Sequence, residues 1–131
     1  MIPRKKILQI LSFHIVFLCV VNYLALPFLW YYRIWWFDMP MHFWGGVVVL
    51  FVLLYTLYPL VTLLRVRHQF LLLLGVFFVG VGWEVFEYIM NNWWAGQTFS
   101  LLDTLSDICF DMAGGGVALL YVTHRDSGII E

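Results

Sequence analysis

The chain has 131 residues, of which 63% are hydrophobic and 11% are charged, and its net charge is −1. Soluble domains carry about 25% charged residues, so this composition excludes an ordinary soluble protein and indicates a membrane protein. The basic residues are too few to suggest a nucleic-acid partner. Cys19 and Cys109 lie in apolar runs, where free thiols act as small hydrophobic groups.

Four stretches are long and apolar enough to cross a bilayer as helices, which takes about 20 residues each. In chain order they cover residues 7–29, 39–64, 70–90 and 101–123. The alternating pattern of barrel strands does not occur, so all four are predicted to be helices. The sequence therefore predicts an all-α polytopic membrane protein, with four transmembrane helices in a small bundle and one domain over residues 1–131.

The first span is too long for a cleavable signal peptide and has no small-residue cleavage site, so we expect it to be retained. His14 and Asn22 share one face of this span. We expect both side chains to form hydrogen bonds to neighbouring helices.

The second span begins with an acid and a histidine. Asp38 and His42 are four residues apart, which places them on one helix face. Taken alone, Asp38 before Pro40 could cap the helix, and His42 could be a hydrogen-bonded interior residue.

The third span carries Glu84 and Glu87, three residues apart on one face. Counting at 1.5 Å per residue from Phe70 places Glu84 roughly 8 Å below the outer interface. That depth is too great for a helix cap, and an ionisable residue inside a membrane is a functional-site hypothesis by default.

The fourth span carries Asp103, Asp107 and Asp111 at four-residue steps. Ser100 and Asp103 fit a capping-box-like helix start. A 20-residue span counted back from Thr123 begins near residue 104, which places Asp111 about 10 Å below the outer interface. Small residues continue the acidic faces, so we expect these faces to meet inside the bundle. The small residues are Gly46, Gly80, Gly114 and Gly115.

Charge predicts the orientation of the bundle. With both termini cytoplasmic, only Arg33 lies outside and six basic residues lie inside, as the positive-inside rule requires. The six are Arg4, Lys5, Lys6, Arg65, Arg67 and Arg125. Five tryptophans form an aromatic belt on the outer side: Trp30, Trp35, Trp36, Trp93 and Trp94. We expect a multi-pass protein of a bacterial-type inner (plasma) membrane, with its acids in the outer half.

Several carboxylates at one level in a low dielectric cannot all be ionised without a positive partner. Either some hold protons or the cluster binds divalent cations. One histidine among oxygen ligands favours Mg²⁺, Mn²⁺ or Ca²⁺ over Zn²⁺ or iron. The candidate metal ligands are Asp38, His42, Glu84, Glu87, Asp103, Asp107 and Asp111.

Three blocks carry these residues: FDMPMHFWGG, GWEVFEY and DTLSDICFDMAGGG. Their order resembles that of the YjdF-like and VanZ-like small integral membrane proteins, in which an Asp-x-x-x-His start precedes a Glu-containing helix and a late Asp-rich helix ending in glycine. The similarity covers about residues 37–116 and includes all seven candidate ligands. The resemblance implies a small integral membrane protein.

Three functions remain open. In the first, an outward-facing acidic metal site acts as a hydrolase or transferase on a lipid or lipid-linked substrate, with Glu84 and Asp107 as catalytic residues. In the second, the acids form a path for a cation or proton. In the third, the protein is a non-catalytic membrane scaffold. Membrane lipids are the expected partners, and a bundle this small could form a homo-oligomer.

Overall fold

The computed structural model describes residues 2–58, 66–95 and 100–127. Every regular element in these ranges is helical, and four helices are long and apolar enough to cross a membrane. The helices are α1 (Arg4–Phe28), α2 (Trp30–Arg33), α3 (Asp38–Thr56), α4 (Val66–Met90) and α5 (Leu101–Ser127). A π-helical turn, Asn91–Ala95, continues α4. The predicted all-α, four-span membrane fold is confirmed.

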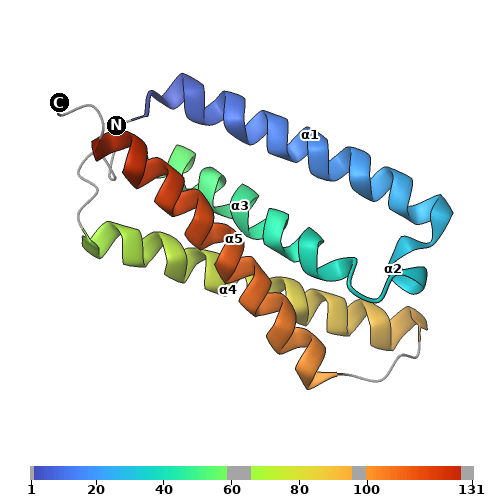
Figure 1. Ribbon diagram of the computed structural model, residues 1–131. Helices are drawn as coiled ribbons and strands as arrows, with labels where there is room; N and C mark the ends of the chain where they lie inside the picture. Colours follow the sequence, from blue (N-terminus) through green and yellow to red (C-terminus); the bar gives the residue numbers. More distant parts are fainter. Residues whose placement is uncertain (1, 59–65, 96–99, 128–131) are drawn as a thin grey trace.

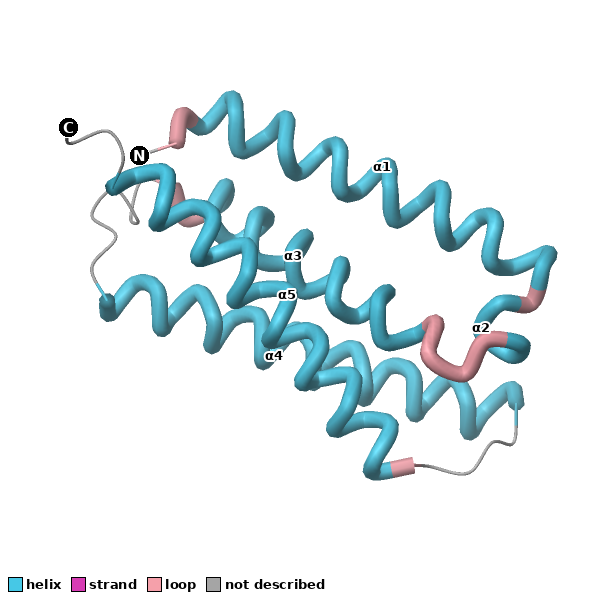
Figure 2. The backbone as a smooth tube through the Cα atoms, viewed as in Figure 1, coloured by secondary structure: helices cyan, strands magenta, loops and turns pink. Residues whose placement is uncertain are grey.

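The helix α3 is the centre of the bundle, because α1, α4 and α5 all pack against it. Figure 1 shows α1 along one side of α3, while α5 crosses both α3 and α4. Figure 2 shows the same arrangement as a tube, with α2 at the far end of α1. We call the end with α2 the outer end, and the end where α1 begins and α5 finishes the inner end.

The chain turns back at Leu29, which has the left-handed φ of 56°. Its N–H bonds to the carbonyls of Ala25 and Leu26, and this closes α1. The rings of Trp30 and Tyr31 then pack edge-on against Phe37, just before α3 begins. Thus α2 lies over the start of α3.

The helix α3 ends at Thr56, earlier than the predicted limit of residue 64. The Thr56 hydroxyl donates to the carbonyl of Val52. The Leu57 N–H donates to the carbonyl of Leu53, which is the last backbone bond of the helix. Pro59 follows in the sequence and disfavours helix in the residue before it. Residues 59–64 lie outside the described residues.

Glycine allows α3 and α5 to cross at backbone contact. A Cβ on Gly46 would collide with the backbone carbonyl of Asp111, and a Cβ on Gly114 would collide with that of Phe43. The predicted role of these two glycines, the close approach of acid-bearing helices, is confirmed.

On the inner side of this crossing the helices bury an apolar core. Its most buried large side chains come from all four long helices, and none of them is polar. They are Ile7, Leu50, Leu54, Leu72, Val76 and Val122. At the outer end, by contrast, aromatic side chains are exposed, including Trp35 and Trp93, as a membrane-interface belt requires.

Candidate metal centre

His42 is the residue around which the acids gather. Its Nδ1 lies 3.4 Å from Oδ2 of Asp111, and both side chains are buried. Its Nε2 lies 3.8 Å from Oδ1 of Asp38 and 3.9 Å from Oε1 of Glu84. The two ring nitrogens therefore have different surroundings: Nδ1 faces one acid, and Nε2 faces acids from two further positions.

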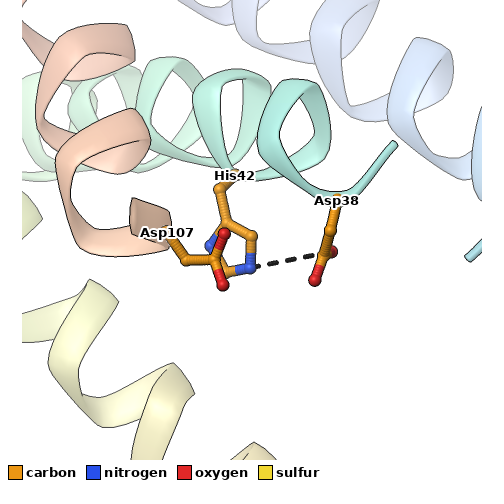
Figure 3. A group of neighbouring side chains, drawn as sticks. All are labelled: Asp38, His42 and Asp107. Atoms are coloured by element: carbon orange, nitrogen blue, oxygen red, sulfur yellow. Dashed lines mark ion pairs between the residues drawn. The ribbon is translucent and has the colours of Figure 1, made fainter. Parts of the chain in front are cut away.

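Two groups of potential ligand atoms share His42. One joins it with Asp38 and Asp107, and the other with Glu84 and Glu87; in each group the ligand atoms lie within 4.8 Å of one another. Figure 3 shows the first group, in which the imidazole lies between the two carboxyl groups. The groups bring together side chains of α3, α4 and α5.

The spacing of these atoms fits a hard cation. Two ligands of one ion can be about 4.2 Å apart when each bond is about 2.1 Å, as for Mg²⁺ or Mn²⁺, and about 5 Å apart for Ca²⁺. The distances from His42 Nε2 to Asp38 and Glu84 are shorter than both limits.

Glu84 has a buried oxygen without a hydrogen-bond partner. Its side chain is 10% exposed, and Oε1, the atom nearest to His42, is the one without a partner. The Thr104 side chain lies beside the same carboxyl group, and Asn91 donates to Oε1 of Glu87 at 3.4 Å. A buried acceptor without a donor is costly, and a bound cation would remove that cost.

Among the residues that the structure describes, no Lys or Arg side chain forms an ion pair with the carboxyl groups of the cluster, and the three ion pairs of these groups are all with His42. Arg33, the basic residue at the outer end, is exposed on α2. The single positive charge of a protonated His42 cannot neutralise all the carboxylates around it.

The remaining two predicted ligands have other surroundings. Asp111 belongs to neither group, and faces Nδ1 of His42 between Gly45 and Gly80. A Cβ on Gly80 would lie 2.7 Å from Oδ2 of Asp111, so the glycine makes room for the carboxyl group. Asp103 also lies in neither group; it is exposed, and its N–H bonds to the hydroxyl of Ser100 at the start of α5.

The structure adds Tyr31 to the neighbourhood of the site. Its hydroxyl donates to Oδ1 of Asn22 at 3.2 Å. Burial, together with the nearby charges of Asp38 and Glu87, raises the pKa of this hydroxyl. In the sequence, Tyr31 only follows Trp30 of the predicted aromatic belt, and nothing local shows that α2 lies over the acids.

Of the two hydrogen bonds expected from the first span to neighbouring helices, the structure contains one. His14 bonds through Nδ1 to the carbonyl of Ile10 in its own helix, so that prediction is wrong, and its ring instead contacts Trp44 of α3. Asn22 accepts a hydrogen bond from Tyr31 of α2, so the bond expected from Asn22 to a neighbouring helix is confirmed. A polar side chain on a helix can form its hydrogen bond with a backbone carbonyl of the preceding turn. The position of the residue on a helix face does not show whether it does so.

A family model described as Predicted membrane protein (DUF2238) matches residues 2–127 of the chain. No curated protein and no solved structure matches the chain. The match runs through all four spans and every acid of the cluster. The chain therefore belongs to the DUF2238 family of predicted membrane proteins.

Proposed function

We propose that this protein is a metal-dependent membrane enzyme whose metal centre lies at the outer end of the bundle. Nε2 of His42 and four carboxyl groups hold one or two divalent cations. The four come from Asp38, Glu84, Glu87 and Asp107. The observation that carries the proposal is Oε1 of Glu84, which is buried, directed towards His42 and without a hydrogen-bond partner.

Asp111 acts in this proposal as a positioning residue. Histidines that bind metals commonly donate their other ring N–H to a carboxylate, which fixes the tautomer and the ring orientation. The contact between Nδ1 of His42 and Asp111 has this form, and it leaves Nε2 free to bind a metal. Asp103 lies at the rim and is not a ligand.

The donor set favours Mg²⁺, Mn²⁺ or Ca²⁺. Four of its five donors are carboxyl groups, and hard cations prefer oxygen ligands. Sequence resemblance to the YjdF-like and VanZ-like proteins rests on blocks that contain the same residues.

The chemistry that suits this centre is hydrolysis or transfer of a phosphoryl or acyl group on a lipid. A divalent cation held by these residues would stabilise charge on the oxygen of such a group and would orient the attacking water or hydroxyl. The second oxygen of one of the ligand carboxyl groups, from Glu84 or Asp107, accepts the proton of that nucleophile. The bond to the leaving oxygen then breaks, and the proton returns to that oxygen.

The positive-inside rule orients the centre towards the outside of a bacterial-type plasma membrane. A periplasm-dependent reporter enzyme fused to the C-terminus would then be inactive, and a cytoplasmic fluorescent reporter would be bright. The opposite pattern would reverse the proposed orientation.

Metal content tests the ligand set. We expect the purified protein to bind a stoichiometric amount of Mn²⁺ and to lose it in Glu84→Gln and Asp107→Asn, which keep the shape of each side chain. Asp103→Asn is the matched control, because it removes an exposed acid of the same helix, and it should retain the metal. Wild-type protein without any bound divalent cation after loading would rule out the enzyme.

The same variants separate the two other functions. Metal-independent, pH-driven ion flux in liposomes that both variants abolish would identify a transporter. Wild-type behaviour of both variants in cells would identify a scaffold.

A further inference from the structure

A cavity of about 320 Å³ lies beside the acidic cluster. Its walls come from all five α-helices, and Asp38, His42 and Asp111 are shared between the cavity and the surroundings of the candidate metal centre. Ligand cavities in proteins are commonly about 300–1,000 Å³, so this one is large enough for a small ligand.

The lining of the cavity changes from polar to apolar with depth. At the outer end it contains Asn22 and Tyr31, which bond to each other, together with Asp38. One to three helical turns further towards the inner end, the walls contain apolar side chains. These are Leu18 of α1, Val49 of α3 and Val76 of α4. The polarity gradient runs the same way as that of a lipid in the outer leaflet, whose headgroup lies above its hydrocarbon chain.

The cavity opens sideways, towards the bilayer. Val79 and Trp83 of its lining are 48% and 54% exposed, and Cys19 is also exposed. All three belong to membrane-spanning helices, so the medium at this opening is lipid rather than water.

We propose that the cavity between α1 and α4 receives the single hydrocarbon chain of an amphiphile from the outer leaflet, and that the anionic oxygen headgroup of the amphiphile lies against Asp38 and His42. This assignment rests on the proposed metal centre, since the cation is what makes an anionic headgroup compatible with the acids. The headgroup is a phosphate or a carboxylate, both of which offer the same charged oxygens.

Two consequences define the substrate class. A volume of about 320 Å³ accommodates one chain, so a single-chain amphiphile is favoured over a two-chain phospholipid. His42 is shared by the cavity and the metal centre, so the reacting bond lies where the chain meets the headgroup, and not in a distant part of the headgroup.

Photocrosslinking of defined lipids tests the proposal. The probes are a long-chain alkyl phosphate and a fatty acid, each with a diazirine at the end of the chain, added to the full-length protein in nanodiscs with Mn²⁺. We expect at least one probe to label the deep lining, around Val49 and Val76, and the probe that labels identifies the headgroup. Equal labelling of this lining by a two-chain phospholipid with the same diazirine would overturn the proposal.

Matched tryptophan variants test the position of the chain. Val79→Trp and Leu18→Trp fill the cavity from opposite walls, and each should reduce labelling at least tenfold. Val85→Trp lies on α4 at an equally exposed position outside the cavity, and labelling should not change. Undiminished labelling in both cavity variants would overturn the assignment.

Mn²⁺ binding, measured on the same samples, distinguishes this inference from the proposed function. Bound Mn²⁺ in the cavity variants shows that they are folded. Labelling that both cavity variants abolish in a protein that binds no metal would overturn the metal centre but leave the chain site. Bound metal with labelling that these variants do not affect would overturn the chain site alone.

Discussion

The inner and outer halves of the α3–α5 pair are packed from opposite kinds of side chain. On the inner side, Leu50 and Val122 are buried in an apolar core. On the outer side, the buried residues of the same helices are His42, Asp107 and Asp111. One pair of helices therefore contains a region suited to stability and a region suited to chemistry, about two turns apart.

The inner half stabilises the association of the helices, whereas the outer half contains the ionisable groups. Lipid is as apolar as leucine, so helices in a membrane associate through close packing, and the inner half supplies this packing. The outer half buries groups that oppose folding unless a cation or proton joins them. The glycine crossing at Gly46 and Gly114 separates the two regions and holds the acids at their distance from His42.

Breaking the crossing should have the largest effect. In Gly46→Ala the new methyl group meets the backbone carbonyl of Asp111, which cannot move without α5. We expect a loss of about 3 kcal/mol in the free energy of unfolding, measured by denaturation in mixed micelles, together with loss of Mn²⁺ binding. Gly116→Ala on α5 is the control, because a Cβ there meets nothing within 4 Å; equal losses in both variants would contradict the crossing.

Removing core packing should affect stability alone. Leu50 is fully buried in the inner half, and Leu50→Ala should reduce the free energy of unfolding by about 2 kcal/mol. The Mn²⁺ affinity of the folded fraction should stay at the wild-type value, because Leu50 is two turns from His42. Leu102→Ala, at an exposed position, should change neither quantity. A large fall in metal affinity in Leu50→Ala would show that the two halves are coupled.

Changing the partner of His42 should affect the metal alone, and of the three changes it should have the smallest effect on the free energy of unfolding. Asp111→Asn removes the charge that orients the imidazole while keeping the shape of the side chain. We expect a 10- to 100-fold loss of Mn²⁺ affinity with little loss of stability, as isothermal titration and thermal unfolding would show. Complete loss of metal, as for Asp107→Asn, would make Asp111 a ligand rather than a positioning residue.

Much of the fold and part of the site follow from local sequence. The four spans come from the length of apolar runs, and the placement of Asp38, Glu84 and Asp107 at one end comes from counting residues along each span. The boundaries of the spans do not follow from the apolar runs, since α3 ends at Thr56 within such a run. Tyr31 and Thr104 could not be predicted from the sequence as neighbours of the site, because their nearness to the acids depends on how α2 and α5 pack.

What the sequence determined by itself was a four-helix membrane protein with its acids at one level, because hydropathy and helical periodicity are properties of each segment alone. Only the tertiary structure decided which acid faces which nitrogen of His42, that Asp103 is at the rim, and that a cavity with a polar outer end adjoins the site. Those features depend on crossing geometry and on side-chain direction. Both are set by contacts between helices that are far apart in the chain.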